Sequence, residues 1–83
     1  MTDEERKEWQ VRLANCERIA EQAYDDMYEK AHSPSAATGY YSDAKEAFSD
    51  AIRAARELGL EVEVKRIEER LEHVKAVFRS QFT

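Results

Sequence analysis

Helix-breaking residues occur at only two places in this chain of 83 residues, and their placement restricts the folds it can adopt. The one proline is Pro34, and the two glycines are Gly39 and Gly59. Because proline and glycine interrupt regular structure, they divide the chain into three uninterrupted segments. The run Ser-Pro-Ser-Ala-Ala-Thr-Gly at 33–39 is expected to form the first connection, and Gly59 the second.

Apolar residues within each segment recur at alternating intervals of three and four, which is the spacing that lines one face of an α-helix. The first segment has Trp9, Leu13, Cys16, Ala20, Ala23 and Met27 in this pattern, the second has Tyr41, Ala44, Phe48, Ala51, Ala55 and Leu58, and the third has Val64, Ile67, Leu71, Val74 and Phe78. We therefore predict an all-α fold, with helices over about residues 3–32, 40–58 and 61–80 in a single domain, 1–83.

Capping signals support these helix ends. Thr2 followed by Glu5 fits a capping box at the start of the first helix. Gly59 after Leu58 fits a left-handed residue that ends the second helix, with Leu60 placed for the hydrophobic contact that accompanies it. Short connections make successive helices antiparallel, so the expected architecture is an up-down-up three-helix bundle.

The first predicted helix is the longest, and this places one end of it beyond the rest of the bundle. At 1.5 Å per residue it exceeds the others by roughly 12 Å. Its C-terminal end is tied to the second helix, so the excess projects at the N-terminal end, near Trp9. Trp9 either covers the end of the core near Leu58 and Leu60 or meets a second subunit.

Composition and charge exclude several classes of protein. No apolar run approaches the roughly 18 residues that a membrane span requires, and the N-terminus is acidic where a secretory signal is basic and then apolar. One cysteine cannot form an internal disulfide, so a reducing cytoplasm is the expected location. The net charge of −5 disfavours nucleic acids and anionic membranes as partners.

Candidate reactive groups each have a structural explanation. Cys16 lies on the apolar stripe and is expected to be a small buried side chain. His32 stands at a helix end and His73 beside Glu69, both ordinary positions for a surface histidine. Glu29 and His32 form one E-x-x-H pair, whereas di-iron bundles need two such pairs and further carboxylates. We predict no catalytic residues, no metal site and no cofactor.

One pattern resembles a DNA-binding motif. Ala55 to Gly59, followed by Leu60, has the spacing of the turn in a helix-turn-helix. The following helix, however, begins with Glu61 and Glu63, which would place carboxylates against bases and phosphates. A glycine C-cap and a tight turn between helices explain the same residues, so DNA binding is the weakest of the three functions considered.

The second segment resembles the second helix of a tetratricopeptide repeat. A glycine and an aromatic residue are followed by small, aromatic and small residues at intervals of four and three, here Gly39, Tyr41, Ala44, Phe48 and Ala51. In this pattern the alanines let a neighbouring helix approach closely, and the phenylalanine fills the space between them. The likeness covers about 20 residues, and the chain contains no second copy of the repeat.

The whole chain is more similar to a microtubule-interacting and trafficking (MIT) domain, a single three-helix bundle of about this length. Residues 41–52 look like the corresponding helix of that family. Members of that family bind short helical or extended peptides in grooves between their helices. The resemblance therefore implies a peptide-binding role for the grooves beside the third helix, although no groove motif can be matched residue by residue.

These observations predict a non-enzymatic protein-interaction module that binds a peptide or helix in a groove beside the third helix. The negative charge is concentrated on the first helix, which carries nine acidic and five basic residues. The predicted partner-binding residues combine aromatic side chains of the first helix with basic ones of the third: Trp9, Tyr24, Tyr28, Lys65, Arg66 and Arg70. The alternative is a structural unit in which two copies complete a homodimeric bundle, since self-association stabilises small helical domains.

Overall fold

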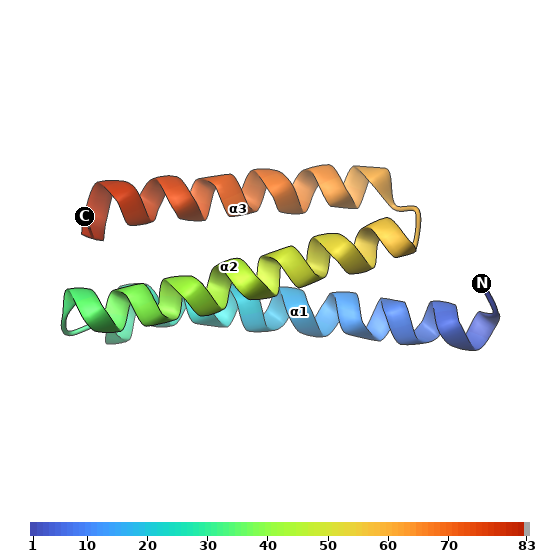
Figure 1. Cartoon of the computed structure of the whole chain (residues 1–83), viewed down its shortest axis with the longest axis horizontal. Coiled ribbons are helices and arrows are strands. Elements are labelled where there is room, and N and C mark those ends of the chain that lie inside the picture. Colours follow the sequence, from blue (N-terminus) through green and yellow to red (C-terminus); the bar gives the residue numbers. More distant parts are fainter. Residues whose placement is uncertain (83) are drawn as a thin grey trace.

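A computed structural model describes residues 1–82 as three α-helices joined by short turns. Helix α1 spans Asp3–Lys30, α2 spans Pro34–Glu57 and α3 spans Glu61–Phe82. Successive helices run in opposite directions, and α1 and α3 run the same way (Figure 1). The predicted all-α, up-down-up three-helix bundle is therefore confirmed, with no strand among the described residues.

The N-terminal cap of α1 follows from its sequence. The backbone N–H of Glu5 donates to Oγ1 of Thr2 at 3.2 Å, and this satisfies one of the free donors in the first turn of α1. Three carboxylates, Asp3, Glu4 and Glu5, occupy the same turn, where the positive end of the helix dipole favours them.

The start of α2 differs from the sequence prediction. The helix begins at Pro34 and not near residue 40, so most of the expected loop is helical. Ser33 is the N-cap: its Oγ accepts a hydrogen bond from the N–H of Ala36 at 3.2 Å. Proline is favoured in the first turn because its missing N–H has no helical partner there. Serine followed by proline therefore starts a helix here, and Gly39 lies inside α2.

A Schellman motif ends α2, as the sequence predicted. Gly59 has a φ of 69°, and its N–H donates to the carbonyl of Arg56 at 3.0 Å. The N–H of Leu60 donates to the carbonyl of Ala55, also at 3.0 Å. This positive φ is the left-handed conformation that favours glycine, and it allows α3 to turn back along α2 within four residues.

Helix α2 is the central element of the bundle. It packs extensively against α1 and also against α3, whereas α1 and α3 approach each other closely at very few points. The largest fully buried side chains come from all three helices and include Phe48, Met27, Ile67 and Val74. Alanines fill much of the remaining core: Ala20 and Ala23 of α1, and Ala37, Ala44, Ala47, Ala51, Ala54 and Ala55 of α2.

The N-terminal end of α1 projects beyond the turn between α2 and α3 (Figure 1). With 28 residues in α1 and 24 in α2, the difference is four residues, about 6 Å and half the length expected from the sequence. The shorter overhang results from the early start of α2. None of the helices in residues 1–82 is both long and apolar enough to cross a membrane.

Candidate docking surface

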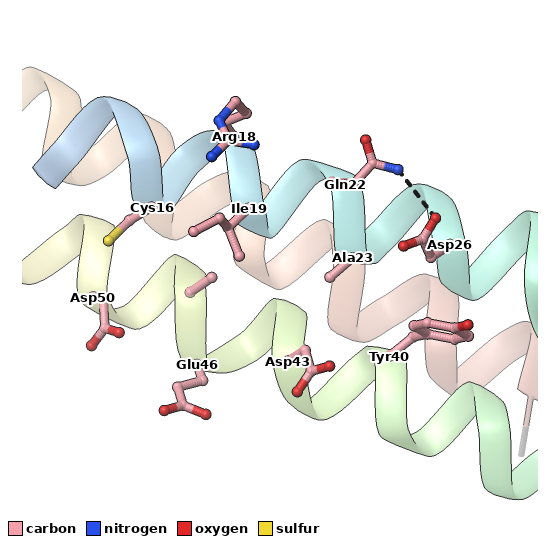
Figure 2. Close-up of a pocket in the computed structure, with 11 residues that line it drawn as sticks. Cys16, Arg18, Ile19, Gln22, Ala23, Asp26, Tyr40, Asp43, Glu46 and Asp50 are labelled. Atoms are coloured by element: carbon pink, nitrogen blue, oxygen red, sulfur yellow. Dashed lines mark hydrogen bonds between the residues drawn. The ribbon is translucent and has the colours of Figure 1, made fainter. Parts of the chain in front are cut away.

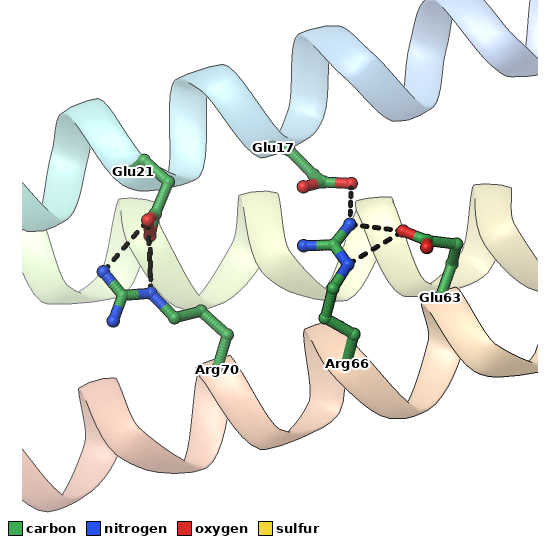
Figure 3. A network of polar contacts seen from close by, with 5 residues as sticks. All are labelled: Glu17, Glu21, Glu63, Arg66 and Arg70. Atoms are coloured by element: carbon green, nitrogen blue, oxygen red, sulfur yellow. Dashed lines mark hydrogen bonds and ion pairs between the residues drawn. The ribbon is translucent and has the colours of Figure 1, made fainter.

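The gap between α1 and α3 is crossed by ion pairs. Arg70 of α3 forms a two-pronged contact with Glu21 of α1: its Nε lies 2.8 Å from Oε1, and its Nη2 lies 3.0 Å from Oε2 (Figure 3). Such a fork-shaped pairing fixes direction as well as distance. The Arg70 guanidinium also lies 5.0 Å from the centre of the Tyr24 ring, close enough for a cation–π contact.

A second bridge lies one turn away. Nη2 of Arg66 donates to Glu17 of α1 at 2.8 Å, and its Nε donates to Glu63 of its own helix at 2.8 Å (Figure 3). The hydrogen bond to Glu17, supported by that to Glu63, raises the pKa of Arg66 above its ordinary value, so the guanidinium stays charged. Beneath these bridges a hollow of about 340 Å³ is lined by Phe48 and Ile67 as well as by the charged residues.

Aromatic rings continue this contact toward the C-terminal end of α3. The ring of Tyr24 meets His73 edge-on at 6.4 Å between centroids, and Tyr28 meets Phe82 at 6.1 Å. Burial raises the pKa of the Tyr24 hydroxyl, which keeps it protonated. The α1–α3 seam, made by these ring contacts and the two arginine bridges, is therefore spanned by long side chains.

The structure divides the six predicted partner-binding residues among three places. Tyr24, Tyr28, Arg66 and Arg70 lie together on the α1–α3 seam in contacts within the chain. Lys65 is exposed beside a separate hollow near Gly59. Trp9 is half-buried at the far end of α1, with the guanidinium carbon of Arg12 4.6 Å from its ring centre. Trp9 lines a hollow with Arg53, and neither Leu58 nor Leu60 lines that hollow.

A different groove is open on the face formed by α1 and α2, away from α3 (Figure 2). It encloses about 440 Å³. Ile19 points into it from α1 while 48% exposed, a large exposure for an isoleucine. Ala23 of α1 and Ala47 of α2, each 7% exposed, line the groove from its two walls. These small residues leave room for the side chains of another helix.

Acidic side chains border this α1–α2 groove. Asp43, Glu46 and Asp50 stand at intervals of three and four along α2, so they share one edge of that helix. Asp26 of α1 lies near Tyr40 at one end of the groove (Figure 2), and Arg18 is the one cation of the lining. None of the ion pairs between residues 1–82 involves Asp43, Glu46 or Asp50.

Toward the N-terminal end of α1 the surface beside the groove changes from acidic to mildly basic. The α1–α2 groove meets two further hollows at Cys16, one lined by Arg12 and Arg53 with Asp50, the other by Lys7 and Arg12 with Glu8. In each of these hollows two cations face one carboxylate. The exposed face is therefore acidic at one end and mildly basic at the other.

Cys16 lies where these hollows meet. Burial raises the pKa of its thiol above the ordinary 9.0, the charge of Asp50 adds to the rise, and Arg12 opposes it. Since the thiolate is the reactive form, this thiol is a poor nucleophile near neutral pH. Among residues 1–82 no three histidine, cysteine or acidic side chains cluster so as to hold a metal ion.

Sequence reasoning missed the α1–α2 groove, although part of its signal was present. The edge formed by Asp43, Glu46 and Asp50 has helical spacing and could have been recognised. Ile19 flanks the apolar stripe of the first helix in the sequence, yet its side chain is 48% exposed. The pairing of Arg66 with Glu17, 49 positions away in the sequence, carries no local signal.

Comparisons with protein-family models, curated proteins and solved structures give no match to this chain. The three-helix fold and the grooves described above are thus the observations on which a function can be argued.

Proposed function

We propose that this protein is a non-enzymatic protein-interaction module that docks a helix of a partner in the α1–α2 groove. The observation that carries the proposal is the exposed apolar floor at Ile19, bordered on the α2 side by three carboxylates that form no ion pair within residues 1–82, namely Asp43, Glu46 and Asp50. An amphipathic helix laid in a groove between two helices is a recurrent mode of recognition. The border favours basic side chains beside the partner's apolar stripe.

The dimensions of the groove suit a short helix. Its α1 wall runs from Cys16 to Asp26, eleven residues that extend about 15 Å along the axis. About three turns of a partner helix would span this length. Alanines at 23 and 47 keep the floor low, so leucine or alanine side chains of the partner would enter between α1 and α2.

The likeness to tetratricopeptide and MIT domains supports a peptide-binding role in general terms. Ala44 and Ala51 have no exposed surface and Phe48 is 2% exposed, which suits the positions of the repeat pattern. We propose that α1 and α2 form a repeat-like hairpin, with α3 covering its other face. Ancestry from either family is a proposal that the pattern in α2 supports.

The α1–α2 groove is a better candidate than the groove beside α3. Arg66 and Arg70 already pair with Glu17 and Glu21, so a partner entering there must replace contacts within the chain. The carboxylates at the start of α3 and along the α1–α2 groove also disfavour DNA.

A titration with a designed peptide tests this proposal. The probe is a synthetic amphipathic helix of about 18 residues with a leucine and alanine stripe flanked by lysines, and calorimetry at low protein concentration measures its dissociation constant. We expect Ile19→Arg and Glu46→Lys each to weaken binding about tenfold or more, because one removes apolar contact and the other repels lysine.

Matched substitutions on α3 serve as controls. Val62 is 80% exposed, so Val62→Arg changes an exposed apolar residue outside the groove. Glu69→Lys reverses a charge beside Arg66 and Arg70. Both variants should bind the peptide with a dissociation constant within about twofold of that of the unmodified protein. Weakening by Glu69→Lys but not by Glu46→Lys would move the site to the α1–α3 seam, and no binding of the peptide by the unmodified protein would contradict the proposal.

A further inference from the structure

The exposed face of α1 carries an arrangement of charges that is centred on Ile19. Arg12 lies seven residues before Ile19 and Asp26 seven residues after it. Glu8 lies eleven residues before it and Lys30 eleven after it. Seven and eleven residues are close to two and three turns of an α-helix, so all five residues share one side of α1.

This arrangement is complementary to itself when it is reversed. If a second α1 ran antiparallel with the two Ile19 side chains opposite each other, Arg12 would face the partner's Asp26 and Glu8 would face the partner's Lys30. The twofold symmetry of such a pair repeats each contact, which gives four opposite-charge pairs around an apolar centre. A parallel alignment would instead place each charge opposite its own copy.

We propose that the helix docked in the α1–α2 groove is α1 of a second copy of this chain, antiparallel and centred on Ile19. This inference rests on the proposed function, since it names the occupant of the same surface. The 48% exposure of Ile19 provides the apolar contact at the axis. Antiparallel pairing of two helical hairpins in this way produces a four-helix core, with α3 on the outside of each half.

The walls of the groove agree with this occupant. Asp43 of α2 lies between the levels of Ile19 and Asp26 along the groove (Figure 2), so the partner's Arg12 would arrive near Asp26 and Asp43. At the other end Arg53 and Asp50 line the hollow that contains Arg12, and Arg53 would meet the partner's Asp26 there.

The contacts that Asp26 and Arg12 already make within the chain are compatible with the antiparallel pairing. Asp26 accepts from Gln22 at 3.1 Å and lies 3.4 Å from Nζ of Lys30, which leaves carboxylate lone pairs for a further donor. Arg12 stacks on Trp9 at 4.6 Å, a contact that orients the guanidinium without occupying its N–H groups.

Sedimentation equilibrium with the full chain tests the proposal. The average mass should rise with protein concentration from 9.7 kDa toward twice that value. Arg12→Glu should raise the dimer dissociation constant about tenfold or more, because it places carboxylates opposite each other. Arg12→Glu combined with Asp26→Arg restores opposite charges and should bring the constant back to within about threefold of the original. Arg6→Glu reverses a charge on a different side of α1. As the control, it should leave the dimer dissociation constant nearly unchanged.

A disulfide tests the register directly. In a Cys16→Ser background, Ile19→Cys should give a covalent dimer on mild oxidation because the two thiols meet at the axis, whereas Val62→Cys should not.

A mass of 9.7 kDa up to about 1 mM protein would overturn this inference, while the peptide titration could still support the proposed function. A dimer that is insensitive to Arg12→Glu, or that crosslinks equally well through Val62→Cys, would show that a different face associates and would also overturn it.

Discussion

Helix α1 contacts its two neighbours in contrasting ways. Against α2 it packs closely over most of its length, and the side chains at the groove between them are as small as Ala23 and Ala47. Against α3 it makes few close approaches, and Arg66 and Arg70 reach across to Glu17 and Glu21. Small apolar side chains lie between α1 and α2 at the groove, whereas long charged and aromatic side chains connect α1 to α3.

This contrast is the basis on which we propose that stability and recognition belong to different faces of the hairpin. Alanine contacts allow two backbones to come close, and they also leave the outer side of the hairpin shallow and open at Ile19. On the opposite side the arginine bridges cross a hollow of about 340 Å³, so a ligand that entered there would have to displace them. One face of the hairpin is therefore covered by α3, and the other face, where we propose that a helix docks, is left uncovered.

The largest effect is expected from enlarging a buried alanine. Ala51 has no exposed surface, so Ala51→Leu should force α2 away from its neighbours and destabilise the fold by about 1–3 kcal/mol. Urea denaturation followed by circular dichroism measures this change. Ala14→Leu, at an exposed position of α1, is the control and should change the free energy of unfolding very little. Equal stability of the two variants would show that close packing at α2 is not what holds the bundle together.

A smaller effect is expected at the α1–α3 seam. Arg70→Ala removes a two-pronged pair whose side chains are 38% and 43% exposed, and it should cost about 0.5–1 kcal/mol after solvent screening. Arg56→Ala removes a single 3.5 Å contact with Glu68 and should cost less. The Arg70→Ala effect should shrink in about 1 M salt, and denaturation at both ionic strengths checks this. If Arg70→Ala lowered the free energy of unfolding as much as Ala51→Leu, the α1–α3 seam would contribute as much to stability as the packing of α2.

The smallest effect is a shift in the titration of Cys16. Because burial and Asp50 raise its pKa, the rate of alkylation by iodoacetamide should reach half its maximum at a higher pH in the folded protein than in the urea-denatured protein. Asp50→Asn removes a negative charge and should lower that midpoint, whereas Asp43→Asn, farther along the groove, should leave it nearly unchanged. A midpoint lower in the folded than in the denatured protein would contradict the partly buried environment of Cys16 beside Asp50.

Sequence reasoning was most successful where structure depends on near neighbours. The capping of α1 by Thr2 and the left-handed turn at Gly59 follow from residues within a few positions of each other. The start of α2 was wrong because Ser33 and Pro34, which are frequent in loops, here act as N-cap and first helical residue.

The candidate site was harder to predict because it depends on which helix faces lie side by side. The basic residues of α3 were expected to border an open groove, but Arg66 and Arg70 reach glutamates 49 positions away in the sequence. The exposure of Ile19 follows from α3 covering only one side of the hairpin, which a residue pattern in α1 alone cannot specify.

The central claim is that recognition takes place on the α1–α2 face and not on the α1–α3 seam. The most direct test is a map of backbone amide shifts in ¹⁵N-labelled protein titrated with the lysine-flanked peptide helix. We predict that the large changes follow the groove at Cys16, Ile19, Ala23 and Ala47, while the amides of Arg66 and Arg70 stay nearly unchanged. Large changes at Arg66 and Arg70 with a quiet α1–α2 groove would contradict this account.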